Sequence, residues 1–274
     1  MIATYHNHSQ WSDGTAAFGQ IHAHATAVGV DILGLSDHLC LYPDGTWPKW
    51  SMAPHLASDY VAEIASFRRL ESLEVRIGLE LDWLGPDYTG ISQIAEKLPL
   101  DYRIGSVHHV AGQQFESSLT YWSEKSVEER DAVFAQYWDS VRAMAESAFC
   151  DIVAHIDLPK KLGFYPTADV GPLIEAALDA IAANHLVVEL NTSGYLRPCA
   201  EAYPTLAILQ KCRARDIAVT LSADGHRPER ILFEFGRGLA LLQQAGFTKI
   251  ARFRERETWF EPLDDALTPG RKSR

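Results

Sequence analysis

The chain repeats one pattern along most of its length: a short apolar run, a loop, and a longer stretch in which apolar residues recur with helical spacing. The apolar runs are continuous rather than alternating, which is typical of strands buried on both faces of a parallel sheet. Such strands are expected at Met1–Thr4, Asp31–His38, Val75–Asp82, Tyr102–His109, Asp151–Asp157, Leu186–Asn191 and Ile217–Ser222. Because about seven such units follow one another without a linker, we predict one α/β domain over residues 1–265, folded as a closed or nearly closed β/α barrel, and a flexible tail at 266–274.

Two helices have recognisable starts, and the last units follow the same pattern. We expect a helix with Ser58 as its N-cap and another over much of residues 228–244. The capping box that starts at Ser126 predicts a long helix. Its apolar face is formed by Phe134, Tyr137, Trp138 and Val141. A last short strand is expected at Lys249–Arg254.

Composition is that of a globular protein: 47% of the 274 residues are hydrophobic, and no apolar run is long enough to span a bilayer. The four cysteines are widely spaced and form no CxxC pair, so we expect a cytoplasmic protein without disulfides. The formal net charge of -11 argues against binding nucleic acid through a broad basic surface. We expect a small phosphorylated molecule as partner and no membrane contact, and the sequence leaves monomer and dimer open.

Two histidines stand at the end of the first apolar run. Residues two apart in an extended strand point to the same side, so His6 and His8 can place two imidazoles at one point. By itself this pair is as typical of a protein without a metal as of half a metal site. A similar pair, His22 and His24, lies in a stretch that reads as helix, where residues two apart diverge, and we expect a surface or packing role for it.

Potential metal ligands recur where successive predicted strands end. They are His6, His8, Asp37, His38, Glu80, Asp82, His108, His155, Asp157, Asp224 and His226, with Asp13 just beyond the first strand. In parallel barrels the loops after the strands form the catalytic face, so these side chains are expected to meet there. Imidazole and carboxylate without thiolate suit zinc, manganese or iron, and the set exceeds what one tetrahedral ion can use. We therefore predict a site for more than one ion.

The motifs around these residues resemble a known family. They are His6-Asn7-His8, Ser12-Asp13-Gly14, Ser36-Asp37-His38, Gly78-Leu79-Glu80, Gly105-Ser106-Val107-His108, Ala154-His155-Ile156-Asp157 and Ser222-Ala223-Asp224-Gly225-His226. In this order they resemble the PHP (polymerase and histidinol phosphatase) superfamily over nearly the whole chain. Residues 151–161, 189–194 and 224–229 resemble its stand-alone histidinol-phosphate phosphatase branch. The resemblance implies a distorted seven-stranded, TIM-like β/α barrel with two or three divalent ions, zinc, manganese or iron, at the C-terminal ends of the strands.

Carried over by position, the resemblance also implies three groups of ligands. The first ion is expected on His6, His8, Glu80 and Asp224. The second is expected on His108 and His155, with Glu80 as the bridge between the two ions. The third is expected on His38, His226 and Asp13, the last of which stands where relatives often have histidine or glutamine.

Such a cluster suits hydrolysis of a phosphomonoester, which in this branch is L-histidinol phosphate in histidine biosynthesis. A water molecule shared by two cations loses a proton at neutral pH and attacks phosphorus as a bridging hydroxide, while the ions neutralise the phosphoryl oxygens. We expect Asp224 or His226 to move protons and Glu80 to act at the bridge.

Candidates for contact with the substrate lie in the loops beyond the strands. Those for the phosphate are Arg197, Lys160, Lys161 and Ser193. Arg197 is preferred because a guanidinium can hold two phosphate oxygens at once. Phe115 is a candidate for the substrate's imidazole side, but its segment, residues 113–116, departs from the more hydrophobic, aspartate-bearing pattern expected for these phosphatases. The reaction class is therefore better determined than the substrate. Cys40 is expected to lie near the site and to be inert.

Other functions stay open at this point. The same metal site would serve another small phosphoester or a nucleotide. An amidohydrolase-like hydrolase also opens with two histidines one residue apart, but its usual bridge is a modified lysine at the fourth strand, and no lysine stands there in this chain. A metal-binding module without catalysis predicts missing ligands, and only the position of Asp13 is ambiguous.

Overall fold

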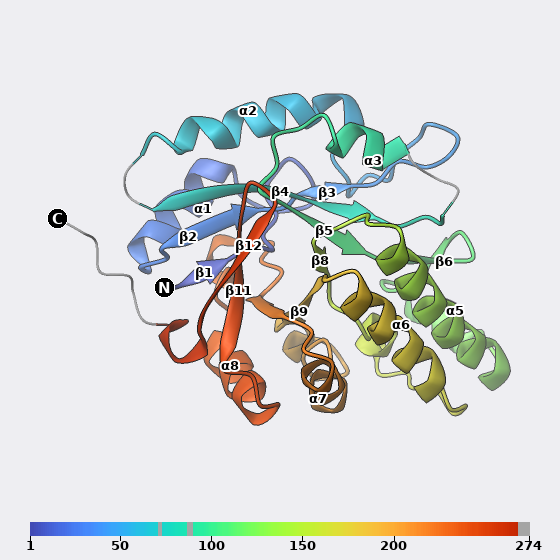
Figure 1. Cartoon of the computed structure of the whole chain (residues 1–274). Helices are drawn as coiled ribbons and strands as arrows, with labels where there is room; N and C mark the ends of the chain where they lie inside the picture. The colour runs from blue at the N-terminus through green and yellow to red at the C-terminus, as the bar shows by residue number, and fades with distance from the viewer. Residues whose placement is uncertain (71–72, 87–89, 268–274) are drawn as a thin grey trace.

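The computed structural model describes residues 1–70, 73–86 and 90–267 (Figure 1). Most of the predicted tail, residues 268–274, lies outside the described residues. Within the described ranges we find no helix with the length and apolar character needed to cross a bilayer.

The centre of the molecule is a parallel sheet. In spatial order its strands are β1 (Ala3–Thr4), β2 (Ile32–Leu35), β4 (Glu74–Asp82), β5 (Tyr102–Ser106), β8 (Ile152–Val153), β9 (Val187–Asn191) and β10 (Val219–Ser222). The short β3 (His38–Leu39) also pairs with β4. Beyond the ends of β1 and β10 a parallel bridge joins Asn7 to Gly225, with His8 N donating to Gly225 O at 3.0 Å. The sheet is therefore a nearly closed barrel, as predicted.

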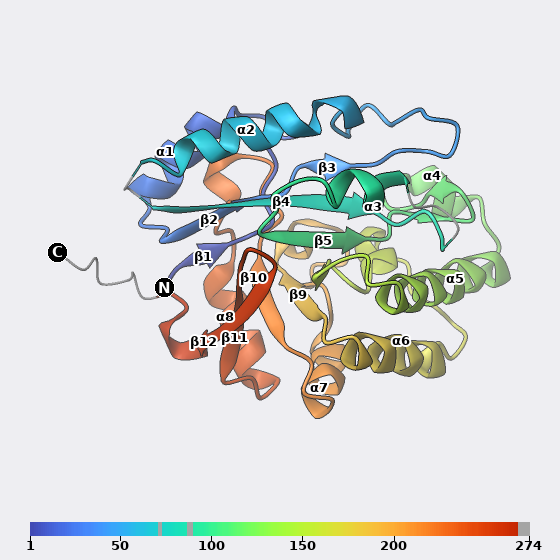
Figure 2. The same cartoon turned by 45° about the horizontal axis from the view of Figure 1, so that its top comes forward.

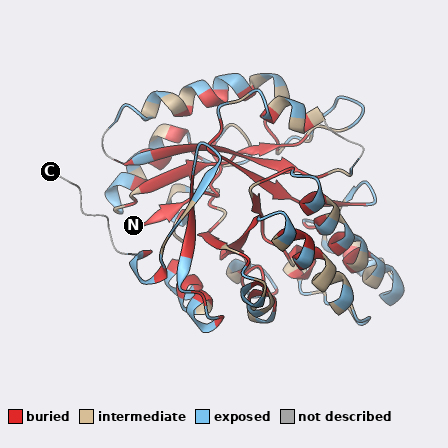
Figure 3. Cartoon of the chain, in the orientation of Figure 1, coloured by how far each residue is buried: buried red, intermediate tan, exposed pale blue. Residues whose placement is uncertain are grey.

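Helices cover the outside of this barrel (Figures 1 and 2). They are α1 (Phe18–Ala27), α2 (Ala57–Phe67), α3 (Gly90–Ala95), α4 (Leu119–Ser123), α5 (Val127–Glu146), α6 (Gly171–Ala183), α7 (Leu206–Ala214) and α8 (Phe235–Gln244). The strands are buried almost throughout, whereas the helices are buried on the inner face and exposed on the outer face (Figure 3). This is the burial expected when every crossover helix covers a strand that is apolar on both faces.

A hairpin of β11 (Lys249–Arg254) and β12 (Glu257–Pro262) follows the barrel. Its strand β11 was expected, whereas β12 was not. Phe253 packs edge-on against Tyr5, with ring centroids 5.2 Å apart, and both belong to the buried cluster that also contains Tyr102. Arg256 at the turn donates its backbone N–H to Asp101 O, just before β5 begins. The hairpin therefore covers the amino ends of the strands, and the predicted ligands lie at the other end.

Local signals predicted some boundaries correctly and others wrongly. The capping box is confirmed, because Ser126 Oγ accepts from Glu129 N and Glu129 Oε2 accepts from Ser126 N. The prediction for Ser58 is wrong: the short helix η1 (Pro54–Leu56) runs directly into α2, which places Ser58 inside the helix. The helix expected over 228–244 is interrupted. It consists of η4 (Pro228–Arg230) and α8, with Glu234 at a φ of 54° between them.

Candidate metal centre

The nine predicted ligands converge at the carboxyl ends of the barrel strands. They are His6, His8, Asp13, His38, Glu80, His108, His155, Asp224 and His226. Each lies in a strand or in the loop directly after it, so the parallel sheet alone brings side chains that are distant in sequence to one place.

Glu80 lies at the centre of this cluster and is fully buried. Its Oε2 is 2.8 Å from His38 Nδ1, 3.1 Å from His6 Nε2 and 3.5 Å from His8 Nε2. Its Oε1 faces the other side, 3.1 Å from His155 Nε2. One carboxylate thus stands between imidazoles of the loop after β1, of β3 and of the loop after β8, which is the position needed for a ligand that bridges two ions.

The fourth ligand expected for the first ion and the group expected for the third ion are also recognisable. Asp224 Oδ1 lies 3.0 Å from His8 Nε2, beside the Glu80 side of the cluster. Asp13 Oδ1 lies 3.2 Å from His226 Nε2 and 3.7 Å from His38 Nε2. The side chains of Asp13 and His226 are 33% and 32% exposed, so this part of the cluster faces solvent.

Many ligand atoms in the cluster lack hydrogen-bond partners among the described residues. The buried ones are His6 Nε2, both ring nitrogens of His8, His38 Nδ1, Glu80 Oε2, His155 Nδ1 and Asp224 Oδ1. Buried polar atoms are normally paired, and a cation would satisfy these atoms together. Imidazole nitrogens and carboxylate oxygens are ligands for zinc, manganese and iron. The residues therefore fit a site for divalent metal ions.

The electrostatics of the cluster agree with this fit. Burial alone would raise the pKa of Glu80, but the imidazoles of His38 and His6 outweigh it and hold the pKa well below its ordinary value. Burial and the neighbouring His226 and His38 lower the pKa of His8 to about 3, so His8 is neutral and one of its ring nitrogens can act as a ligand.

A carboxylate without a predicted role, Glu189 in the middle of β9, holds the cluster in place. Its Oε1 lies 2.7 Å from His6 Nδ1, and its Oε2 accepts from the backbone N–H of His155 at 2.9 Å and from Asn191 Nδ2 at 3.0 Å. Histidine ligands commonly donate their second N–H to a carboxylate in this way, which aims the other nitrogen at the metal. The only sequence signal for this role was an acidic residue in an otherwise apolar strand.

Two other carboxylates from the strand ends contact the site, and the ligand atoms of Asp82 lie within 4.8 Å of those of His38 and His108. Asp37 accepts from the backbone N–H and the hydroxyl of both Ser9 and Ser12, and so orders the loop that leads to Asp13. Asp82 Oδ1 lies 2.9 Å from His108 Nδ1. This contact leaves His108 Nε2 directed at Glu80 Oε1, 3.7 Å away.

Two ligand candidates have an unusual backbone conformation. Asp224 has a φ of 52° and His155 a φ of 21°. Positive φ is sterically unfavourable for side chains other than glycine, and such residues are concentrated at functional sites where the surroundings hold them in place. At His155 the hydrogen bond from its backbone N–H to Glu189 is one such restraint.

The residues expected to contact substrate have differing surroundings. Lys160 is buried, and its ammonium group lies 2.8 Å from Asp157 Oδ2, 3.1 Å from Glu201 Oε2 and 2.9 Å from Ala202 O. Phe115 is fully buried and packs edge-on against the rings of Trp122 and Tyr137. These surroundings favour ion pairing for Lys160 and core packing for Phe115 over contact with a substrate.

The other candidates lie nearer to solvent. Arg197 is exposed after the short helix η3 (Ser193–Leu196), and its guanidinium has no hydrogen bond or ion pair among the described residues. Lys161, in η2 (Leu158–Leu162), pairs with Glu116. Burial alone would raise the pKa of Glu116, but Lys161 and His108 lower it, which places this pair beside the cluster. Ser193 is buried at the start of η3 and donates its backbone N–H to Asn191 Oδ1.

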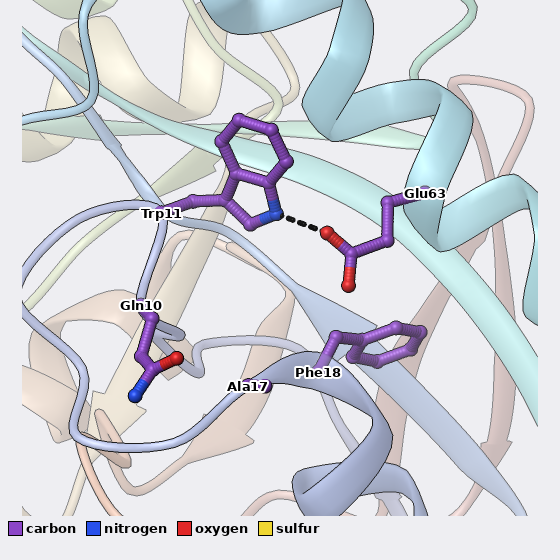
Figure 4. Close-up of a pocket in the computed structure, with 5 residues that line it drawn as sticks. All are labelled: Gln10, Trp11, Ala17, Phe18 and Glu63. Carbon is purple, nitrogen blue, oxygen red and sulfur yellow. Dashed lines mark hydrogen bonds between the residues drawn. The ribbon is translucent and has the colours of Figure 1, made fainter.

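A separate pocket of about 290 Å³ lies between the loop after β1 and helix α2 (Figure 4). It is lined by Gln10, Trp11, Ala17, Phe18 and Glu63, and none of these is a predicted ligand. Trp11 Nε1 donates to Glu63 Oε2 at 2.6 Å, which anchors the loop to α2. The same loop leads to Asp13, so this pocket belongs to the support of the cluster and contributes no ligand to it.

Comparisons with known proteins agree with the fold and the cluster. The model of the PHP domain family matches residues 4–193. A protein of Deinococcus radiodurans named "probable histidinol-phosphatase" is 29% identical over 237 residues, which cover 85% of this chain and 88% of that protein. A histidinol-phosphatase of Lactococcus lactis is 23% identical over 259 residues, covering 91% of this chain and 93% of its own.

Among solved structures, the crystal structure of the histidinol phosphate phosphatase of Lactococcus lactis, complexed with zinc, L-histidinol and phosphate, superimposes with a TM-score of 0.77. It is 20% identical, and the match covers 94% of this chain and 98% of that chain. A crystal structure from Listeria monocytogenes, named "putative histidinol phosphatase", gives a TM-score of 0.75 at 19% identity, and the match covers 86% of this chain and 99% of that chain. The barrel is thus the fold of these structures, and the chain belongs to the PHP domain family.

Proposed function

We propose that this chain is a metal-dependent phosphomonoesterase that hydrolyses L-histidinol phosphate to L-histidinol and phosphate. The observation that carries the proposal is the buried cluster at the C-terminal ends of the strands, in which unpaired imidazole nitrogens face Glu80 and Asp224. The relatives named histidinol-phosphatase, which align over most of this chain, support the choice of substrate. We also propose a cytoplasmic location, supported by four free cysteines.

We propose that the cluster holds two or three divalent ions, with Glu80 as the shared ligand. Bound there, the ions would withdraw charge from the phosphoryl oxygens and lower the pKa of a water molecule, so that an ester is attacked at neutral pH. The chain itself fixes the geometry. Glu189 aims His6 Nε2 into the cluster, and Asp82 aims His108 Nε2 at Glu80.

The accessible edge of the cluster is where a phosphoester would enter. Asp224 and His226 lie at this edge, with side chains 18% and 32% exposed, and we propose that one of them gives a proton to the leaving oxygen. His226 Nδ1 lies 3.0 Å from Asp224 O, which fixes the orientation of the imidazole ring relative to the cluster.

Arg197 is the proposed phosphate ligand with the best access. Its guanidinium is exposed and has no partner among the described residues, so it can form two parallel hydrogen bonds to phosphate oxygens without breaking an existing ion pair. Lys161 is the second proposed phosphate ligand. Its ammonium group would have to contact both Glu116 and the phosphate. We do not propose a phosphate contact for Lys160, because its ammonium group is enclosed by protein acceptors.

The experiment that tests the substrate is phosphate release by the metal-reconstituted protein from L-histidinol phosphate, side by side with nucleotide and sugar phosphates. We expect a strong preference for L-histidinol phosphate that His155→Ala abolishes. Glu175→Gln, which changes an ion-paired carboxylate in α6 away from the cluster, is the control and should retain the activity. Equally slow hydrolysis of every ester would contradict L-histidinol phosphate as the substrate but would still agree with a phosphomonoesterase.

A further inference from the structure

A second group of potential metal ligands lies beside the main cluster and shares none of the nine ligands proposed above. It consists of Cys40, Asp82 and His109, which we call the Cys40 site. All three side chains are buried, and their ligand atoms lie within 4.8 Å of one another. They come from three neighbouring parts of the barrel: Cys40 follows β3, Asp82 ends β4, and His109 begins the short β6 (His109–Val110).

Two buried atoms of this site point to a missing ligand. Asp82 Oδ2 and His109 Nδ1 have no hydrogen-bond partner among the described residues, although Asp82 and His109 are 1% and 7% exposed. His109 Nδ1 lies 3.6 Å from Asp82 Oδ1. The Cys40 thiol also makes no hydrogen bond within the described ranges, so it does not satisfy the carboxylate. An acid, an imidazole and a thiol that face one another without pairing are better explained by a cation than by packing.

The other atoms of the same side chains are anchored. His109 Nε2 lies 3.3 Å from the hydroxyl of Tyr42, and Asp82 Oδ1 lies 2.9 Å from His108 Nδ1. These contacts fix the orientations of the imidazole and the carboxylate, and they leave His109 Nδ1 and Asp82 Oδ2 as the free ligand atoms. Metal ligands in proteins are typically held in this way by partners outside the coordination sphere.

The donor set identifies the class of cation. A thiolate, an imidazole and a carboxylate suit zinc or a similar thiophilic ion, whereas magnesium and calcium prefer oxygen ligands alone. Three protein ligands leave a fourth tetrahedral position for water. On binding, the thiol gives its proton to solvent and the sulfur forms the bond to the ion.

We propose that Cys40 Sγ, Asp82 Oδ2 and His109 Nδ1 bind one additional zinc-like divalent cation. Asp82 also contacts His108, a ligand of the main cluster. An ion in the Cys40 site therefore restrains His108 through Asp82. The two sites are therefore linked through one carboxylate. The proposal does not depend on the substrate of the main cluster.

Cobalt substitution in the full-length protein tests the site without any activity measurement. Co²⁺ bound to a thiolate has a sulfur-to-metal charge-transfer band in the near ultraviolet, and no other group of potential ligands among the described residues contains sulfur. We expect the band in the wild-type protein and its loss in Cys40→Ser, together with one ion fewer per chain by elemental analysis. The matched control is Cys212→Ser, a buried thiol in α7, which should keep both the band and the ion.

If Cys40→Ser does not fold, His109→Gln tests the same site and should also lose one ion. Two results would overturn the proposal: absence of the band from cobalt-loaded wild-type protein, or its persistence in Cys40→Ser. Both can be obtained whether or not the protein hydrolyses L-histidinol phosphate, so failure here is distinguishable from failure of the proposed function.

Discussion

The substitution Glu189→Gln tests whether a carboxylate outside the predicted ligand set controls the metal centre. In the structure its two oxygens serve three donors: His6 Nδ1–H, the backbone N–H of His155 and the amide of Asn191. Glutamine keeps the size of the side chain but has only one oxygen, and its NH₂ group is itself a donor. Neither orientation of the amide can satisfy all three.

Both orientations weaken metal binding. If the amide oxygen faces His6, the donors of His155 and Asn191 meet another donor, and each buried donor left unpaired costs about 1–3 kcal/mol. If the NH₂ group faces His6, the imidazole has to accept at Nδ1, and its proton then sits on Nε2, the nitrogen that faces Glu80. Loss of such supporting partners typically lowers metal affinity or activity by about 10- to 100-fold.

The assay is zinc affinity by competition with a chelating dye, followed by kcat/KM for phosphate release at saturating zinc. Glu175→Gln is the matched control, because Glu175 pairs with Lys211 and Arg215 on the exposed side of α6, where an ion pair is worth about 0–1 kcal/mol. Wild-type zinc affinity and wild-type kcat/KM in Glu189→Gln would refute the reasoning.

Three further predictions concern substrate, pH and stability. Arg197→Ala should lower kcat/KM by about 10- to 100-fold, the loss of a charge-assisted hydrogen-bond pair, with unchanged metal content in elemental analysis. Burial alone would lower the pKa of the His6 and His38 imidazoles. The carboxylate of Glu189 beside His6 and that of Glu80 beside His38 outweigh burial and raise both pKa values, that of His38 to about 10. Zinc must displace these protons to bind. Its affinity should therefore rise with pH by up to about tenfold per pH unit for each proton released. A zinc affinity that calorimetry finds independent of pH would contradict this prediction. Ser126→Ala should cost about 1 kcal/mol, seen as a Tm lower by a few degrees with unchanged kcat.

The sequence predicted the barrel and the location of the cluster because both follow from short-range patterns. In a barrel, continuous apolar strands are covered outside by the crossover helices and inside by side chains of the other strands, and parallel strands place every strand end at one face. His6, Glu80 and Asp224 could therefore be expected to meet without knowledge of any contact. The capping box at Ser126 is equally local and is confirmed.

The features that the sequence did not predict depend on partners that are distant along the chain. Glu189 contacts His6 across 183 positions, and nothing near either residue indicates the pair. Lys160 is a candidate phosphate ligand from sequence because it follows the fifth predicted strand, yet the fold brings Glu201 to it from another loop. Ser58 has the right chemistry for an N-cap, but the chain is already helical when it reaches this position.

Removal and return of the metal ions tests the central claim most directly. Protein treated with a strong chelator and then dialysed should release no phosphate from L-histidinol phosphate, and zinc or manganese should restore the activity. Glu80→Gln retains the shape of the side chain but removes the negative charge of the proposed bridging ligand. Zinc or manganese should not restore activity to this variant. Full activity after chelation, or wild-type activity of Glu80→Gln, would contradict the account of the cluster as a metal-dependent phosphatase centre.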